Sequence, residues 1–266
     1  MDIKTFDDMW RESSNMNLSA TKDVWDLRAK EFNGKDKNAR MDEVIEFLLS
    51  KNIVNKSSEI LDIGCGPGKY SVEFSKKSKY VTGIDISPNM IKYARENAEK
   101  LNIRNISFDA VPWQHIDLNQ RAWNNRFDLV FASMSPAIDS KDTLVKMNEA
   151  SKGYCFLSGF VTREDEVRDT INRLSSKGKY INNWGIKMYC AFNILWQLGI
   201  YPEIYYRDVQ WENKRRLEDA INVYTVHIKE EPQIVYDIKN YLNSISKDGI
   251  IVENTKAKIG WMIWRV

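Results

Sequence analysis

Residues 60–68 are Ile60-Leu61-Asp62-Ile63-Gly64-Cys65-Gly66-Pro67-Gly68, an apolar run followed by three glycines at every second position. The apolar run predicts a buried strand, and a helix is expected to follow the turn. Glycine has no Cβ, so it lets the main chain approach a ligand closely at such a turn. A second apolar strand ends at Asp85, about 20 residues on, where a carboxylate can bind a ribose. The segment therefore predicts a cofactor that contains a nucleoside.

The spacing of these glycines excludes two common phosphate-binding turns. The dinucleotide fingerprint is G-x-G-x-x-G, whereas here the third glycine comes one residue early. The phosphate loop G-x-x-x-x-G-K-[ST] needs a glycine where Ile63 stands and a hydroxyl residue where Tyr70 stands. Neither a pyrophosphate nor a triphosphate is therefore well provided for.

The pattern resembles the first motif of the class I S-adenosylmethionine-dependent methyltransferases, in which a strand ends in D-x-G-C-G-x-G. Further similar motifs lie at Trp25–Phe32, Gly83–Ser87, Phe108–Ala110 and Phe127–Ser133. The likeness is to the small-molecule branch, types 11 and 25. It implies S-adenosylmethionine as the methyl donor and S-adenosylhomocysteine as the product.

The resemblance also implies a cofactor-binding set. This set is Trp25, Arg28, Asp62, Gly64, Cys65, Gly66, Gly68, Asp85, Ile86, Met90, Asp109, Ala110 and Ser133. Asp62 and the glycine turn would border the methionine half. Asp85 would accept hydrogen bonds from both ribose hydroxyls, because a carboxylate has two oxygens at the spacing of a cis-diol.

The residues expected at the adenine and methionine ends admit alternatives. By the resemblance, Ile86 and Met90 pack on the adenine, while Asp109 and the Ala110 N–H bind its edge. Asp109 has an alternative role as a turn former at a strand end. Trp25 and Arg28 either close over the methionine carboxylate or are a packed aromatic and a solvated charge on an amphipathic helix.

The catalytic candidates are few. Methyl transfer is an in-line displacement, and a general base is needed only if the acceptor arrives protonated. His115, after the third strand, is one candidate base, with a surface or structural histidine as the alternative. Ser133 and Ser135 either touch the acceptor or form a turn into the next helix. Methyltransferases that act on adenine or glutamine carry two adjacent prolines after the fourth strand, and Met134 and Ser135 stand in their place. The other histidine, His227, is interpreted as structural.

Aromatic residues gather between 180 and 211: Tyr180, Trp184, Tyr189, Phe192, Trp196, Tyr201, Tyr205, Tyr206 and Trp211. They could line a pocket for a flat, apolar or cationic acceptor. The substrate candidates are Trp113, Trp184, Tyr189 and Tyr205. The alternatives are an ordinary core and a homodimer surface. A basic cluster, Arg207 with Lys214–Arg216, either meets an anionic substrate group or is a solvated loop.

Composition narrows the class of protein. Among 266 residues, 39 are basic and 37 acidic, a net charge of +2 that does not indicate a nucleic-acid partner. Three dispersed cysteines suit a reducing cytoplasm, and two histidines are a poor supply of metal ligands. No secretory signal or membrane span is expected. The hypothesis is a methyltransferase for a small-molecule acceptor; the alternatives are an RNA or protein methyltransferase and a non-catalytic S-adenosylmethionine-binding protein.

The predicted fold is an α/β, Rossmann-like three-layer sandwich with a seven-stranded, mostly parallel sheet and an antiparallel last strand. Strands are expected at 59–63, 80–85, 105–109, 127–132, 153–160, 204–209 and 258–265, and helices at 89–101, 163–175, 186–198, 217–228 and 232–244. We expect one domain over 1–266. Its parts are a helical cap (1–55), a cofactor-binding core (56–162), substrate-side insertions (163–250) and a last strand (251–266).

Overall fold

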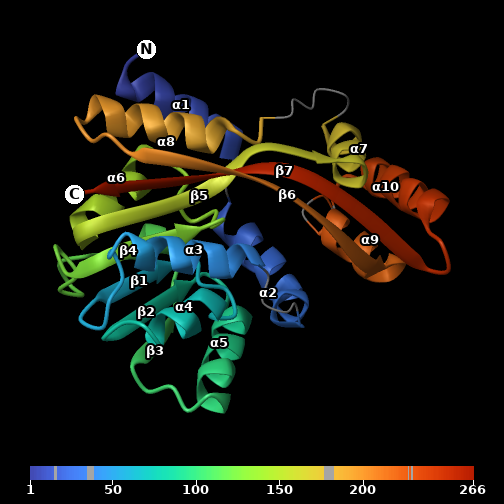
Figure 1. Cartoon of the computed structure of the whole chain (residues 1–266). Coiled ribbons are helices and arrows are strands. Elements are labelled where there is room, and N and C mark those ends of the chain that lie inside the picture. Colours follow the sequence, from blue (N-terminus) through green and yellow to red (C-terminus); the bar gives the residue numbers. More distant parts are fainter. Residues whose placement is uncertain (15–16, 35–38, 177–182, 227, 229) are drawn as a thin grey trace. The chain divides into compact units, whose positions relative to one another are not determined.

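A computed structural model describes the chain except for residues 15–16, 35–38, 177–182, 227 and 229 (Figure 1). The chain divides into two compact units. The first comprises Met1–Gly159, Ile186–Tyr205 and Trp261–Val266, and the second Phe160–Gly185 and Tyr206–Gly260. The second unit holds most of the predicted insertion, but residues 186–205 belong to the first.

The strands form one seven-stranded sheet in the order β3-β2-β1-β4-β5-β7-β6. Their bounds are β1 (Glu59–Ile63), β2 (Tyr80–Asp85), β3 (Ile106–Ala110), β4 (Phe127–Ser133), β5 (Ser151–Asp165), β6 (Glu203–Arg216) and β7 (Ile250–Arg265). The pairings among β1 to β5 are parallel. The C-terminal strand runs antiparallel (Figure 1). The predicted fold class is confirmed.

The helices are α1 (Ile3–Ser14), α2 (Leu18–Gly34), α3 (Ala39–Ser50), α4 (Lys69–Ser75), α5 (Pro88–Lys100), α6 (Lys141–Ala150), α7 (Glu166–Ser175), α8 (Ile186–Gln197), α9 (Leu217–Thr225) and α10 (Pro232–Ile245). A single 3₁₀ turn, η1 (Trp113–His115), is described between β3 and β4. Helix α5 begins as predicted, with Pro88 in its first turn and the Ser87 hydroxyl accepting from the Met90 N–H. No helix in the described ranges is long and apolar enough to cross a membrane.

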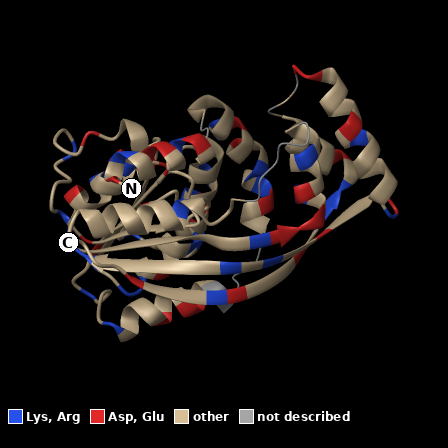
Figure 2. Ribbon diagram, turned by 90° about the horizontal axis from the view of Figure 1, so that it is seen from above, with Lys and Arg blue, Asp and Glu red and all other residues tan. Residues whose placement is uncertain are grey.

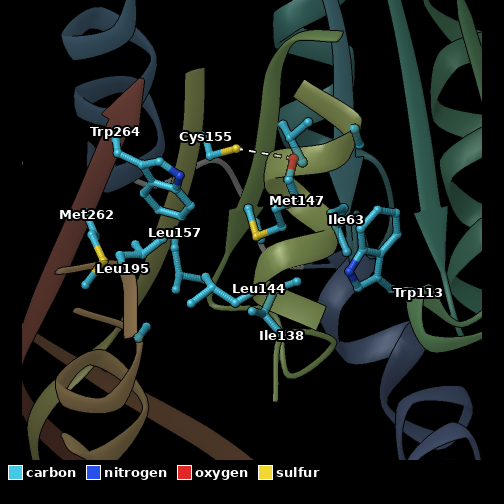
Figure 3. Close-up of a cluster of buried hydrophobic side chains, with 14 of the residues drawn as sticks. Ile63, Trp113, Ile138, Leu144, Met147, Cys155, Leu157, Leu195, Met262 and Trp264 are labelled. Carbon is cyan, nitrogen blue, oxygen red and sulfur yellow. Dashed lines mark hydrogen bonds between the residues drawn. The ribbon is translucent and has the colours of Figure 1, made fainter. Parts of the chain in front are cut away.

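The core of the first unit lies between the sheet and helices α1, α6 and α8 (Figure 3). Leu144 and Met147 of α6 meet Leu157 of β5, and Leu195 of α8 meets Met262 of β7 in this cluster. Apolar burial of this kind contributes roughly 25 cal/mol for each Å² removed from water. The core thus fixes the carboxyl ends of the parallel strands, where the glycine turn lies.

The second unit has its own small core and two buried polar networks. Its apolar cluster joins α7, α9, α10 and β7. The Arg215 guanidinium donates to Glu253 at 2.8 Å, and the Tyr224 hydroxyl donates to the same carboxylate at 2.6 Å. Thr255 and Arg163 both donate to Asp165. Each buried charge in these networks therefore has a hydrogen-bonding partner, as burial requires.

The helix predicted from Arg163 begins instead at Glu166, and that start was wrong. Residues Arg163 to Asp165 continue β5, and the Asp165 carboxylate caps the helix by accepting from the Arg168 N–H at 3.0 Å. The acidic residues that suggested a first helical turn therefore include its N-cap. Strands β5, β6 and β7 are all longer than predicted.

Candidate active site

The glycine turn leads from β1 into α4 and is tied to β2. The N–H groups of Gly64 and Cys65 both donate to the Ile84 carbonyl, at 2.8 and 3.0 Å. Gly64, Gly66 and Gly68 have φ angles of 71°, 55° and 77°, a region that other residues adopt only with strain. The sequence therefore places glycine where the backbone of the turn requires it.

The three glycines differ in what surrounds them. A Cβ on Gly64 would lie 2.0 Å from Ser135 Oγ, and one on Gly68 would lie 2.9 Å from both Ala94 Cβ and Phe108 Cζ. Among the described residues, a Cβ on Gly66 would have only the Met90 sulfur within 4 Å, at 3.9 Å. Gly64 and Gly68 thus allow close packing of the protein itself, whereas Gly66 leaves space for a ligand.

Asp85 ends β2 beside this space. One carboxylate oxygen accepts from the Gly66 N–H and the other from the Ser87 N–H, both at 2.9 Å. Burial raises the pKa of Asp85 to about 6, although both of these N–H groups oppose the rise. The two hydrogen bonds hold the carboxylate in one orientation at the mouth of the turn.

Asp62 is a second buried carboxyl group, on β1. It accepts a 2.5 Å hydrogen bond from the Ser71 hydroxyl of α4. Burial raises the pKa of Asp62 to about 7, and the charge of Asp85 adds to the rise. Among the described residues, no lysine or arginine forms an ion pair with either carboxylate. The pair can therefore receive a positively charged ligand that also carries hydroxyl donors.

The predicted adenine contacts lie at the ends of β2 and β3. Ile86 is half-buried and Met90 is buried. Asp109 forms a 2.7 Å ion pair with Arg121, with 46% of its side chain exposed, and Ala110 is exposed. An exposed pair of this kind contributes little to stability. The adenine roles of these residues stay predictions.

Helix α2 is docked beside Asp85 by a polar contact. The Asp26 carboxylate accepts from the Ser87 hydroxyl at 2.5 Å and from the Asn89 N–H at 3.2 Å, at the start of α5. On the same helix, the Arg28 guanidinium stacks over Phe32 and Trp25 and pairs with Glu31 at 3.5 Å. The structure thus brings the helix of Trp25 and Arg28 close to the ribose end of the predicted site.

The loop after β4 contains a strained residue. Met134 has a φ of 55°, and its N–H donates to both the carbonyl and the hydroxyl of Ser158. Ser133 Oγ lies 3.0 Å from Ser158 Oγ, and Ser135 is buried against Gly64. Strain in a non-glycine residue persists where its surroundings enforce it, and such residues cluster at functional sites.

His115 is exposed at the end of η1. Its neighbour Gln114 reaches the loop instead, donating to the Ala137 carbonyl at 3.2 Å and to Asp139 at 3.0 Å. Residue 227, the other histidine, lies outside the described residues. Sequence reasoning did not single out Gln114.

The four substrate candidates are not gathered at one place in the first unit. Trp113 is buried in the core and its indole donates to the Thr143 carbonyl at 3.0 Å. Tyr189 is 50% exposed on α8, and Tyr205 packs on Phe47. Trp184 belongs to the second unit, where its ring meets Phe160.

A family model described as a methyltransferase domain matches residues 54–219, more than half of the chain. The chain belongs to this methyltransferase family. The match contains the glycine turn, Asp85 and the strained loop after β4. This methyltransferase uses S-adenosylmethionine as its cofactor, and the open space at Gly66 beside two buried carboxylates fits a cationic nucleoside.

Two curated relatives match a short part of the chain. A probable cobalt-precorrin-6B C(15)-methyltransferase (decarboxylating) of Methanobrevibacter smithii is 39% identical over 56 residues, 21% of this chain and 30% of that protein. A ribosomal protein L11 methyltransferase of Lachnospira eligens is 29% identical over 126 residues, 45% of this chain and 40% of that protein. The chain spans about a third of the length of the first curated relatives it matches.

A solved structure supports the fold. The magnesium protoporphyrin IX methyltransferase of Synechocystis PCC 6803, with bound S-adenosylhomocysteine, has a TM-score of 0.55 at 13% identity. The match covers 91% of this chain and 98% of that one. At this identity the likeness concerns the fold alone.

We expect the affinity for S-adenosylmethionine to fall as the pH is lowered from about 7.5 to about 5.5. The pKa values of Asp85 and Asp62 are about 6 and about 7, so both groups take up protons across this range. Protonation removes hydrogen-bond acceptors for the ribose and negative charge that favours the sulfonium. Because binding favours the ionised forms, it should release protons near pH 6.5, roughly midway between the two values.

Calorimetry in buffers of different ionisation enthalpy measures both the affinity and the released protons. Asp109→Asn is the matched control, because this exposed carboxyl lies outside the buried pair and the variant should keep the pH dependence. An affinity that does not change over this range would show that neither buried carboxylate contacts the cofactor.

Proposed function

We propose that this methyltransferase transfers the methyl group of S-adenosylmethionine to a small-molecule acceptor. The observation that carries the choice of acceptor is the distribution of charge. Basic and acidic residues are interspersed over the ribbon (Figure 2), and the net charge of the chain is +2. Enzymes that bind RNA concentrate lysine and arginine on one surface to contact phosphates.

In this proposal Asp85 binds the ribose hydroxyls, and Asp62 with the turn at Gly64–Gly66 borders the methionine half. The cofactor supplies an activated methyl group. The protein has to hold the acceptor in line with the methyl group and exclude water. The sheet order changes direction between β1 and β4, and ligands of open α/β sheets bind at such a point. We place the acceptor there, against the loop that follows β4.

An RNA or protein acceptor is the second candidate, and the names of relatives favour it. They include a 23S rRNA (uracil(1939)-C(5))-methyltransferase of Shewanella sediminis, 32% identical over 96 residues, and the ribosomal protein L11 methyltransferase named above. Each match covers less than half of the relative. Neither match therefore carries the acceptor of the whole relative over to this chain.

The test measures release of S-adenosylhomocysteine with three supplements: a small-metabolite extract, total RNA and a protein extract. Turnover with the metabolite extract, unaffected by nuclease or protease treatment, would support the proposal. Turnover only with RNA or only with protein would overturn it in favour of the second candidate. A failure to bind S-adenosylmethionine by calorimetry would remove the basis of both.

A further inference from the structure

Lys187 is the only charged residue of α8, whose sequence is Ile-Lys-Met-Tyr-Cys-Ala-Phe-Asn-Ile-Leu-Trp-Gln. Its Nζ donates to the Ser135 carbonyl oxygen at 2.5 Å. A Cβ on Gly159 would lie 3.7 Å from Lys187 Cδ, so the stem of the side chain runs beside β5. The residue as a whole is half-buried.

The position of this amine relative to the glycine turn is defined by Ser135. The Ser135 side chain occupies the space next to Gly64, since a Cβ on that glycine would lie 2.0 Å from Ser135 Oγ. The carbonyl of the same serine holds Lys187 Nζ. Ser135 therefore lies between the amine and Gly64, the residue that follows β1. This is the point where the strand order reverses, between β1 and β4.

Burial, and not a neighbouring charge, favours the neutral form of Lys187. Burial lowers the pKa of Lys187 to about 8, and the Asp139 carboxylate, in the loop after β4, opposes this shift. On the β5 side, the neighbouring positions Ser158 and Gly159 carry no charge. Burial and the Asp7 carboxylate of α1 raise the pKa of Cys190, which lies on α8 with Lys187. A sulfonium bound nearby is a like charge and would lower the pKa of the lysine further.

We propose that Lys187 is the general base of the methyl transfer, and that the acceptor is consequently a protic nucleophile, an N–H or O–H group. The inference rests on the proposed function, because it requires methyl transfer at this end of β4. The Ser135 carbonyl accepts one N–H of the neutral amine and so orients its lone pair. An amine with a pKa of about 8 has a larger neutral fraction near neutral pH than an ordinary lysine, and this neutral fraction can take a proton.

Methyl transfer coupled to removal of the acceptor proton forms two bonds and breaks two. The acceptor nitrogen or oxygen forms a bond to the methyl carbon as the carbon–sulfur bond breaks, and the bonding pair stays with sulfur. The acceptor proton leaves its nitrogen or oxygen and passes to Lys187 Nζ. The products are the methylated acceptor, S-adenosylhomocysteine and a lysine ammonium, which returns its proton to solvent.

The first experiment needs no acceptor. Competitive labelling of the full chain with acetic anhydride, read for each lysine by peptide mass spectrometry across pH, gives the titration midpoint of Lys187. The reference is the exposed Lys77. We expect the midpoint of Lys187 to lie near pH 8, against about 10.4 for an ordinary lysine. It should lie about one pH unit lower with S-adenosylmethionine than with S-adenosylhomocysteine, because only the former carries the sulfonium charge.

An ordinary midpoint, or equal midpoints with the two ligands, would overturn the inference. Calorimetry on the same samples separates this failure from that of the proposed function. If S-adenosylmethionine binds and the midpoints are equal, Lys187 does not face the methyl group. If it does not bind, the proposed function itself fails.

The second experiment uses Lys187→Arg and Lys187→Met with the extract that supports turnover. Arginine keeps the positive charge and can donate to Ser135, but it does not release a proton near neutral pH. Both variants should bind S-adenosylmethionine and lose kcat by about 10²–10⁴-fold, the range for a general base. An arginine variant that keeps the wild-type kcat and its pH profile would show that only the charge matters, which would overturn the proposal.

Discussion

Gly64→Ala should lower the free energy of unfolding by about 2–5 kcal/mol, the largest stability loss we expect from a single added methyl group in the first unit. Two effects add. The backbone at Gly64 has a φ of 71°, where a residue with a Cβ costs about 1–2 kcal/mol. The new Cβ would also lie 2.0 Å from Ser135 Oγ and 2.8 Å from Ser135 Cβ, and overpacking of this kind costs about 1–3 kcal/mol.

Gly199→Ala is a matched control, because it separates strain from collision. Gly199 has a φ of 77°, and no atom of the described residues lies within 4 Å of the point where its Cβ would be. Only the backbone cost of about 1–2 kcal/mol therefore applies there. Adding Ser135→Gly to Gly64→Ala should restore the part of the loss that the collision causes. Urea unfolding of the four proteins measures these differences. Equal losses at Gly64 and Gly199 would contradict the tight packing of the turn.

The parts of the fold that could be predicted are those with local signals. The bounds of β1 and β2 and the start of α5 follow from apolar runs, from glycines that need a positive φ, and from a serine–proline cap. Asp85 could be located because the carboxyl ends of neighbouring parallel strands meet at one edge of the sheet. These features depend on a few consecutive residues, so a single sequence reveals them.

The extended ends of the strands could not be predicted, because their buried positions are polar. Along β7, Ile251, Glu253, Thr255, Ala257 and Ile259 are buried in strict alternation. Glu253 and Thr255 conceal this period of two from any hydrophobic pattern. Their burial is explained by partners that lie far away in the sequence, Arg215 for Glu253 and Asp165 for Thr255.

Lys187 was missed for a related reason, although a signal for it existed. A single lysine in an otherwise apolar helix is unusual, because lysine is seldom enclosed without a partner. Its contact with Ser135 spans 52 positions in the sequence, so only the fold reveals which strand end it reaches. The aromatic segment drew attention instead, since its residues are conspicuous in composition. The described members of this segment divide between the two units, and Tyr180 lies outside the described residues.

Asp85→Ala should weaken the binding of S-adenosylmethionine by about 1–3 kcal/mol, which is about 5- to 150-fold in Kd. The carboxylate is buried and oriented by the N–H groups of Gly66 and Ser87, so its oxygens are fixed before the cofactor arrives. Removing it eliminates two acceptors and one negative charge. Calorimetry measures the affinity, and thermal unfolding of the same samples shows whether the fold is intact.

Asp85→Asn tests whether the size or the charge of this side chain determines the affinity for S-adenosylmethionine. An asparagine has one acceptor oxygen and one NH₂ group, so either the Gly66 or the Ser87 N–H would lose its acceptor. We therefore expect it to lose nearly as much affinity as alanine, whereas Asp109→Asn, at the exposed ion pair with Arg121, should lose much less. Unchanged affinity in Asp85→Ala would show that the ribose lies elsewhere.

The raised pKa of Asp85 also makes the stability of the fold depend on pH. Its pKa is about 6 in the folded chain, against an ordinary value of 3.8, so the folded protein holds the proton more tightly than the unfolded chain. Its contribution to stability is therefore greatest below the unfolded pKa and is lost as the pH rises through about 6. Near neutral pH the ionised carboxylate thus opposes folding, and a bound cation with hydroxyl donors offsets that cost. Asp85→Ala should consequently show a large loss of affinity for S-adenosylmethionine and only a small change in the melting temperature of the ligand-free protein. This combination distinguishes a binding residue from one that only supports the fold.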